Sequence, residues 1–227
     1  MSGKFLSAFC ALALIGLIAA PAAAQKPLPL SPAAAPAKAA STSAPPANTE
    51  PPSLDRINAY FNAMRGLQAD FVQVSPDGRR FGGILYLLRP GRMRFEYHPP
   101  ATLEVVADGR SVAIRDRKLK TQDVYFIGQT PLKFLLQPKI NVAKDSKVTG
   151  LKRDGDAIVL DLEDKSTFGG TSRIRVVFDG ASYALREWTV SDPQGNDTRV
   201  LLSNLNLAAL PAKNLFEIEE QRLVDPK

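Results

Sequence analysis

The chain contains very few of the residues on which most catalytic and metal sites depend. Its 227 residues include one cysteine, one histidine and one tryptophan. The only cysteine, Cys10, lies in a hydrophobic N-terminal run, so the rest of the chain has no thiol for a disulfide, a metal site or catalysis. His98 stands beside Pro99-Pro100 and is predicted at the surface. Since nucleophile-elbow, P-loop, dinucleotide and metal-spaced motifs are also missing, we expect no enzyme activity, cofactor or metal.

Charge of one sign is not concentrated anywhere along the sequence. The formal net charge of +6 falls to +5 without Lys4, and to +4 when Lys26, Lys38 and Glu50 are also left out. This mild excess permits contact with anionic lipid headgroups, but no basic cluster is dense enough to predict a nucleic-acid-binding surface.

Residues 1–24 have the pattern of a secretory signal peptide. Lys4 precedes an apolar run, and Pro21-Ala22-Ala23-Ala24 provides a cleavage site before Gln25. An uncleaved membrane anchor is the alternative, but the run is shorter than the roughly 18 to 20 apolar residues of a spanning helix. A lipid-anchored cysteine is also disfavoured, because apolar residues continue well beyond Cys10. We therefore predict a cleaved signal peptide and export to the periplasm.

Residues 25–52 consist almost entirely of alanine, proline, serine and threonine. Eight prolines and only three charged residues fall in this stretch. Such a composition cannot bury enough apolar surface to fold, so it predicts an extended, disordered linker. The remaining residues, 53–227, are sufficient for one domain with a full hydrophobic core.

Most of this folded region alternates hydrophobic and polar residues with a period of two. Between Arg92 and His98, for example, Met93, Phe95 and Tyr97 alternate with polar residues, as in a strand with one buried face. The same reasoning predicts ten strands, at 67–74, 81–88, 92–97, 102–106, 111–115, 147–152, 157–162, 173–178, 184–191 and 198–205.

Turn signals separate many of these segments. Asp-Gly pairs begin at Asp77, Asp108, Asp154 and Asp179, and a Pro-Gln-Gly sequence after Asp192 adds a fifth turn. Aspartate and glycine tolerate the positive φ of tight hairpins, so the pattern predicts an antiparallel meander. Ten strands in succession exceed what a flat sheet carries comfortably. We therefore predict a mainly β protein with some α structure, whose strongly curved antiparallel sheet forms an incomplete β-barrel.

Two segments are predicted as helices that cover the hollow face of the sheet. Residues 53–66 begin at a good N-cap residue, Ser53, and gather hydrophobic residues on one side. Residues 130–137 begin with Thr130 as the expected N-cap and end before Pro138, which cannot continue a helix. Lys133 interrupts the otherwise apolar second helix, which is expected to pack against hydrophobic surface on most sides.

Apolar binding is the chemistry that remains. The candidate wall of a hydrophobic cavity comes from inward-facing strand residues and the second helix: Phe71, Leu85, Leu87, Met93, Phe95, Tyr97, Leu103, Val105, Ile174, Val176 and Trp188, with Leu132, Leu135 and Leu136. A filled core uses the same residue types, so both interpretations stay open at this point. The carboxylates Asp161, Glu163 and Asp164 are expected on the outer, solvated side of a hairpin.

Several motifs, in order, resemble the LolA family of periplasmic lipoprotein carriers. They are Phe71-Val72-Gln73, Gly83 to Gly91 with its Arg89-Pro90-Gly91 ending, Val106 to Gly109, and Thr130-Pro131-Leu132. The resemblance implies a half-barrel with a helical lid over a hydrophobic cavity for lipoprotein acyl chains, without a cofactor. It also implies that a monomer accepts triacylated lipoproteins from an inner-membrane ABC lipoprotein-releasing transporter and delivers them to an outer-membrane lipoprotein acceptor.

Arg89 is the charged residue expected to act inside this arrangement. By strand parity it faces the same side as Met93 and Phe95, where a buried guanidinium needs acceptors. The resemblance assigns it as the latch of the lid, bonded to backbone carbonyls of the lid helix. Pro138 leaves the carbonyls of residues 135–137 without intrahelical donors, which agrees with that role.

The alternative is a non-carrier member of the same fold that acts in the cell envelope as a lipid or lipoprotein sensor or as a protein-binding scaffold. The exposed arginines expected at 173, 175 and 186 suit such an interface, although alternation makes them ordinary surface residues first. The missing lipobox disfavours an outer-membrane acceptor, and a regulator is expected to carry a further domain.

Overall fold

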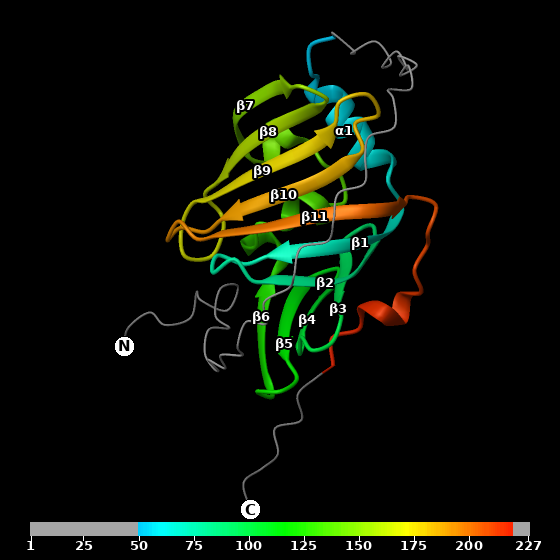
Figure 1. The fold of residues 1–227 in the computed structure, drawn as a ribbon, viewed down its shortest axis with the longest axis vertical. Coiled ribbons are helices and arrows are strands. Elements are labelled where there is room, and N and C mark those ends of the chain that lie inside the picture. Colours follow the sequence, from blue (N-terminus) through cyan, green and yellow to red (C-terminus); the bar gives the residue numbers. More distant parts are fainter. Residues whose placement is uncertain (1–49, 220–227) are drawn as a thin grey trace, which may run out of the picture.

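The sheet is a single antiparallel meander of eleven strands that curls strongly without closing (Figure 1). The computed structural model describes residues 50–219. The predicted signal peptide, residues 1–24, and nearly all of the predicted linker, residues 25–52, lie outside the described residues.

The helices and strands occur in an order that explains the open barrel. They are α1 (Leu54–Ala63), β1 (Gly66–Val74), β2 (Arg80–Leu88), β3 (Arg92–Tyr97), β4 (Leu103–Asp108), β5 (Ser111–Asp116), β6 (Thr121–Phe126), η2 (Ile127–Gln129), α2 (Lys133–Leu136), α3 (Val142–Asp145), β7 (Lys147–Asp154), β8 (Ala157–Asp164), β9 (Ser172–Asp179), β10 (Leu185–Ser191), β11 (Asp197–Asn206) and η3 (Lys213–Phe216). Consecutive strands pair within each half, and β1 pairs with β11, so β6 and β7 remain as free edges.

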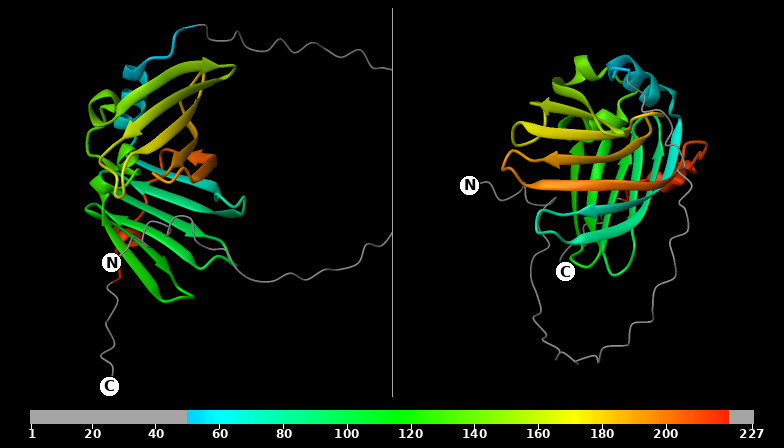
Figure 2. Two further views of the ribbon diagram at one scale, coloured as in Figure 1. Left: turned by 90° about the vertical axis from the view of Figure 1, so that its left-hand side faces the viewer. Right: turned by 45° about the horizontal axis from the view of Figure 1, so that its top comes forward.

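Residues 127–145, which we call the lid segment, connect these two free edges. They contain η2, α2 and α3. Seen from the side, the sheet curves around one side on which α1, α2 and α3 lie together (Figure 2). The predicted fold class, a curved antiparallel half-barrel with helices over its hollow face, is confirmed.

The strand β6 is missing from the sequence prediction. Its Val124 and Phe126 are 54% and 66% exposed, and none of its six residues is fully buried. An edge strand pairs on one side only and buries little, so Thr121–Phe126 shows no regular alternation of apolar and polar residues. The sheet therefore has eleven strands rather than the predicted ten.

The first predicted helix is confirmed and the second is shorter than predicted. In α1, the Ser53 Oγ accepts a hydrogen bond from the Arg56 N–H at 3.5 Å, as expected of an N-cap. The helix α2 covers only Lys133–Leu136, and Thr130 is not its N-cap. The Thr130 hydroxyl instead donates to the Ile127 carbonyl at 2.9 Å and closes η2. Among residues 50–219, no helix is long and apolar enough to cross a membrane.

Four of the five predicted turns contain a glycine with positive φ, as the hairpin argument requires. The turn after Asp179 is different, because the positive φ falls on Tyr183. Gly180 is required there by close packing, since its N–H donates to the Asp156 carbonyl at 2.8 Å and an added Cβ would lie 2.7 Å from that oxygen.

Candidate functional site

The inner face of the sheet is almost wholly apolar, and the lid segment is buried in it. Of the fourteen residues predicted to line a cavity, thirteen are at most 5% exposed and belong to one continuous core. The fourteenth, Leu103, is partly buried against that core. The structure thus brings the predicted strand residues together with Leu132, Leu135 and Leu136 of the lid segment.

A chain of aromatic rings runs from α1 through the lid segment to the sheet. Phe134 of α2 lies with its ring centre 6.3 Å from Phe61 and 6.1 Å from Trp188, and Trp188 lies 6.3 Å from Phe95. Phe95 in turn contacts Phe71 at 5.0 Å. The sequence prediction omitted Phe134, although it belongs to the same apolar segment as Leu132 and Leu135. Edge-to-face packing of this kind fills the interior with side chains of the lid.

One cavity of about 20 Å³ lies between the sheet and the lid segment. Five of the predicted wall residues line it, and five further residues were not predicted: Gln73, Pro131, Val190, Thr198 and Val200. A volume of this size accommodates roughly one water molecule and no acyl chain. This cavity is therefore too small for an acyl chain while Pro131 and Leu132 of the lid segment lie against it.

Arg89 connects the ends of two helices. Its Nη1 donates to the Phe61 carbonyl of α1, and its Nη2 donates to the carbonyls of Gln137 at 2.6 Å and Pro138 at 3.1 Å. Each of these carbonyls lies at the end of a helix, where it has no hydrogen-bond donor within that helix. The sequence analysis predicted acceptors among residues 135–137. Gln137 is one of these residues, whereas Phe61 and Pro138 lie outside that range. Partial burial lowers the pKa of the guanidinium, which still remains charged at neutral pH.

Two asparagines of α1 hold the same end of the lid segment. The Asn62 side chain forms two hydrogen bonds with the backbone of Ile140, donating to its carbonyl at 2.8 Å and accepting from its N–H at 2.9 Å. The Asn58 Oδ1 accepts from the Val142 N–H at 3.0 Å. Arg89 and these asparagines therefore attach the C-terminal part of the lid segment to α1 and to the β2–β3 turn.

A buried ion pair holds the beginning of α2. The Lys133 Nζ lies 2.8 Å from Asp164 Oδ1, and these side chains are 9% and 2% exposed. Lys133 also donates to the Ser166 Oγ at 2.6 Å, and the Ser166 N–H donates to Asp164 Oδ1 at 2.9 Å. The neighbouring Phe168 N–H donates to the Gln129 carbonyl of η2 at 2.8 Å. The loop between β8 and β9 thus binds the N-terminal part of the lid segment.

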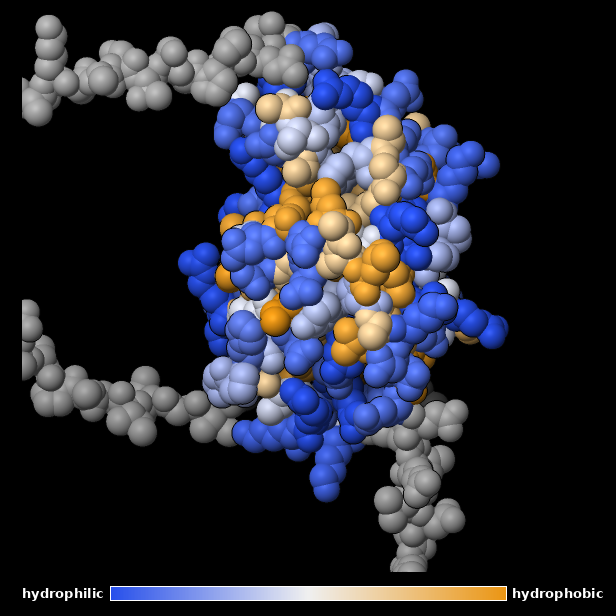
Figure 3. Space-filling view, turned by 90° about the vertical axis from the view of Figure 1, so that its right-hand side faces the viewer, coloured by the Kyte–Doolittle hydropathy of each residue, from blue (hydrophilic) through white to orange (hydrophobic). Residues whose placement is uncertain are grey.

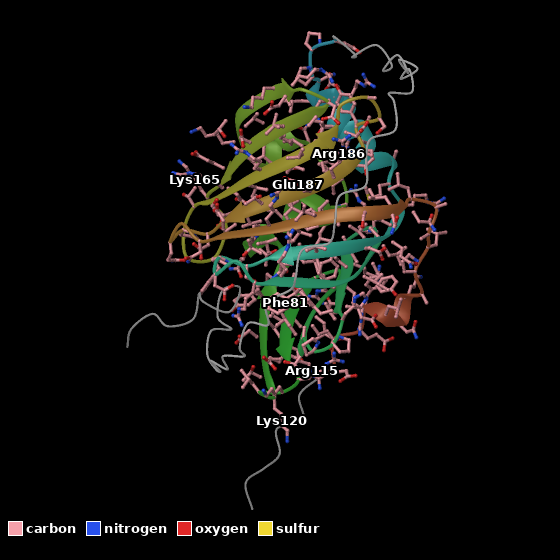
Figure 4. The ribbon with its side chains drawn as sticks, viewed as in Figure 1. Phe81, Arg115, Lys120, Lys165, Arg186 and Glu187 are labelled. Atoms are coloured by element: carbon pink, nitrogen blue, oxygen red, sulfur yellow. The ribbon has the colours of Figure 1, made fainter. Side chains whose placement is uncertain are left out.

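The prediction that Asp164 faces solvent is wrong. Ile158, Leu160 and Leu162 alternate along β8 as fully buried residues, and Asp164 continues that parity at its end. The adjacent Lys165 is exposed and points away from the sheet (Figure 4). Two features of the sequence could have predicted the pair of Lys133 and Asp164: the alternation of buried residues along β8, and a single lysine in an otherwise apolar helix.

The cavity wall carries one polar pair. The Tyr97 hydroxyl donates to Gln73 Oε1 at 2.7 Å, and both residues are 5% exposed. Burial raises the pKa of the Tyr97 hydroxyl, which is therefore neutral over the physiological range. Gln73 belongs to the Phe-x-Gln sequence on β1, but the sequence analysis did not place it in the cavity.

The face shown in Figure 3 is largely hydrophilic, with hydrophobic side chains gathered across its middle. Two of the three outer arginines are paired: Arg175 lies 2.7 Å from Asp161, and Arg186 lies 2.5 Å from Asp179. Hydrogen bonds from the Ser182 backbone and hydroxyl, with Arg186, lower the pKa of Asp179 to about 2. These arginines are thus engaged within the sheet itself.

The described residues contain little that resembles a catalytic or metal centre. His98 is exposed, as predicted. Within residues 50–219, no group of three or more histidine, cysteine, aspartate or glutamate side chains is arranged to hold a metal ion. The site that the structure offers is therefore the apolar interior beneath the lid segment.

Comparison with known proteins gives a consistent match. Residues 62–219 match the family described as "Outer membrane lipoprotein carrier protein LolA". An outer-membrane lipoprotein carrier protein from Methylococcus capsulatus is 30% identical over 188 residues, which cover 79% of this chain and 88% of that protein. A protein of the same name from Chromobacterium violaceum is 31% identical over 171 residues, covering 71% and 81%. A solved LolA superfamily protein from Nitrosomonas europaea aligns with a TM-score of 0.40 and 10% identity, covering 73% of this chain and 97% of that one.

Proposed function

The chain belongs to the LolA family of outer-membrane lipoprotein carriers, and on that basis we propose that it is a periplasmic chaperone that binds the acyl chains of lipoproteins and carries them from the inner to the outer membrane. The relatives are named for carriage and not for a reaction, in keeping with a non-enzymatic role. The predicted signal peptide over residues 1–24 belongs to the same proposal, since it would export the chain to the periplasm, and the predicted linker over residues 25–52 would precede the folded domain there.

The observation that carries this proposal is the way the apolar interior is closed. Buried side chains of the lid segment occupy the space enclosed by the sheet, and few polar contacts keep them there. The wall of the acyl-chain site would be the fourteen residues predicted from sequence, with Leu132, Leu135 and Leu136 on its movable side. Arg89 would act as the latch, because one guanidinium bonds both α1 and the end of α2.

The energies of closing and loading are of similar size. A hydrogen bond to a charged group contributes about 1.5–3 kcal/mol, and each methylene buried in an apolar site contributes about 0.8 kcal/mol. Burial of about two to four methylenes therefore offsets each latch bond that breaks. Several acyl chains of one lipoprotein would open the lid readily, and an acceptor with a more open apolar site would remove them.

The partners follow from this mechanism. Loading would occur at an inner-membrane ABC lipoprotein-releasing transporter, and delivery at an outer-membrane lipoprotein acceptor where one is present. The protein would travel as a soluble monomer with the acyl chains covered.

The test is a release assay. The exported chain is purified and added to energised spheroplasts that are synthesising a triacylated lipoprotein, and the soluble fraction is examined for a complex of the two. We expect a stable soluble complex that is absent when acylation is blocked. If folded protein releases no lipoprotein, the carrier function is wrong, and a sensor or scaffold of the same fold replaces it.

A further inference from the structure

The two free edges of the sheet differ in the side chains that they expose. Of the seven large hydrophobic residues that are exposed within residues 50–219, three lie in the β5–β6 turn and in β6: Leu119, Val124 and Phe126. The other edge, β7, exposes no large hydrophobic residue among those described, and it carries the exposed lysines Lys147 and Lys152. Charges of this kind commonly protect an edge strand from association, whereas β6 exposes apolar side chains.

Basic residues surround the apolar side chains of the β6 edge. Residues 110–126 contain five arginines and lysines and two aspartates, a net charge of +3. Arg117, Lys118 and Lys120 flank Leu119 in the sequence, and all four residues are exposed. Lys120 lies at the end of the molecule opposite α1 and points away from the sheet (Figure 4). Exposed cations next to exposed apolar side chains are what an anionic lipid surface attracts.

Both aspartates of this stretch are directed away from its exposed face. Asp116 is 9% exposed, and its Oδ1 accepts hydrogen bonds from the N–H of Lys118 at 2.8 Å and of Leu119 at 3.1 Å. These bonds fix the backbone of the turn, which presents Leu119 with 61% of its surface exposed. Asp123 is paired with the buried Ile114 and so lies on the inner face, whereas Val124 alternates to the outer face.

We propose that this edge, residues 117–126, binds the surface of a membrane that contains anionic phospholipids. Leu119, Val124 and Phe126 enter the headgroup region, while Arg117 and Lys118 bind lipid phosphates. Peptide groups of β6 that have no partner strand bond water and headgroups there, since the edge does not reach the hydrocarbon core. The inference does not depend on the proposed function, because contact with a bilayer is a property of this surface and requires no cargo.

The small size of the apolar area favours a bilayer over an acidic protein as the partner. A stable protein interface buries roughly 800 Å² on each partner and needs a complementary shape. A bilayer needs no complementary shape, only cations near the phosphates and a few inserted apolar side chains. Such binding is reversible and sensitive to salt, because the attraction falls off within a Debye length of the surface.

The first experiment is sedimentation of the exported chain with lipid vesicles. Wild type is expected to bind vesicles of equal parts phosphatidylcholine and phosphatidylglycerol at low salt, to leave them at high salt, and to ignore phosphatidylcholine alone. The double variant Arg117→Gln with Lys118→Gln should bind about tenfold to thirtyfold more weakly, since each cation near the surface contributes about fivefold. Lys147→Gln with Lys152→Gln removes the same charge from the β7 edge and is the matched control. Its affinity should stay within about threefold of wild type.

The second experiment tests the apolar side chain at the tip. Leu119→Ser should weaken vesicle binding by about threefold to tenfold, because the leucine is only partly withdrawn from water in the headgroup region. Leu210→Ser is the control, since Leu210 is 65% exposed and follows β11 at the other end of the strands. Residues 25–227 contain no cysteine, so Leu119→Cys introduces a single thiol for an environment-sensitive dye. Its emission should shift to shorter wavelength on the mixed vesicles, and that of a dye at Leu210→Cys should not.

The outcomes decide the inference without touching the carrier function, which is tested separately by lipoprotein release. Equal binding to both kinds of vesicle overturns it, as does a Lys147 and Lys152 control that loses as much affinity as the Arg117 and Lys118 variant. An unshifted dye at residue 119 on bound vesicles overturns it too. If folded wild type does not bind the mixed vesicles, the inference is wrong, and an acidic protein becomes the partner to seek for this edge.

Discussion

The two ends of the lid segment are attached by different kinds of bond. At the C-terminal end, a partly exposed Arg89 donates to neutral backbone carbonyls, and asparagines of α1 bond the backbone of residues 140–142. At the N-terminal end, two almost completely buried charges, Lys133 and Asp164, pair with each other. The bonds at the first end can be exchanged for water when they break. Separation at the second end leaves a buried charge unpaired, which is far more costly.

Under the proposed carrier function, this difference predicts the direction in which the lid would open. Residues 137–142 should leave the sheet first, while η2 and Lys133 stay attached to the loop between β8 and β9 and residues 134–136 follow the moving end. The lid would then move as a flap about its N-terminal side, uncovering the aromatic residues that Phe134 contacts.

The largest effect is expected from breaking the buried pair on one side only. Lys133→Met leaves the Asp164 carboxylate buried without its cation, and should lower the free energy of unfolding by about 3–5 kcal/mol in urea denaturation. The double variant Lys133→Met with Asp164→Leu should regain most of the lost free energy of unfolding, because it has no unpaired buried charge. Lys152→Met, at a lysine side chain 63% exposed, is the control and should change little. If Lys133→Met lowered the free energy of unfolding as little as Lys152→Met, the N-terminal end of the lid segment would be no more firmly held than its C-terminal end.

A moderate effect is expected from removing the latch. Arg89→Leu deletes three hydrogen bonds to carbonyls that are not fully buried. Water can replace these bonds, so the closed lid should lose about 2–3 kcal/mol in total, and not the full value of about 1.5–3 kcal/mol for each bond. Amide hydrogen exchange should rise at residues 137–142 and much less at residues 127–130. In a release assay the variant should retain loaded lipoprotein, because the closed form no longer competes with the cargo. Arg175→Leu on the outer face is the control, and loading and release at the wild-type rate by Arg89→Leu would exclude the latch role.

A smaller effect in the same direction is expected from Asn62→Ala. The variant loses both hydrogen bonds to the Ile140 backbone, which should cost about 1–2 kcal/mol. Hydrogen exchange should increase at residues 140–142 without a change at the Lys133 end. Increased exchange at Gln129 and Thr130 instead would contradict a flap that opens from its C-terminal side.

The smallest effect is expected from Ser166→Ala. Lys133 and Asp164 keep their direct contact in this variant and lose only the shared hydroxyl, so stability should fall by about 1 kcal/mol or less. Thermal unfolding of Ser166→Ala and Lys133→Met under the same conditions gives the ratio of their losses of stability. A loss as large as that of Lys133→Met would mean that the serine, and not the ion pair, holds this end.

The comparison also shows where reasoning from the sequence stopped. Alternation placed ten of the proposed wall residues in the core, the apolar second helix placed three more, and Ser53 marked the start of α1. The edge strand β6 was not predicted, because its residues are too little buried for apolar and polar residues to alternate along it. Asp164 was assigned to the wrong face, although the parity of β8 was available. Phe134 and Gln73 were also omitted, although Phe134 lies in the predicted apolar helix and Gln73 shares the strand parity of Phe71.

The sequence by itself determined ten of the eleven strands, the positions of the turns, the first helix and the apolar character of the inner face. These features depend on local physics, namely a side-chain period of two, the positive φ that glycine tolerates, and helix capping. Only the tertiary structure decided that Arg89 bonds two helix ends, that Lys133 finds Asp164 thirty-one residues away, and that the interior keeps a cavity of about 20 Å³. Hydrophobic burial is non-directional, so the same residues suit a filled core and a lidded cavity, and long-range contacts between polar groups choose between them.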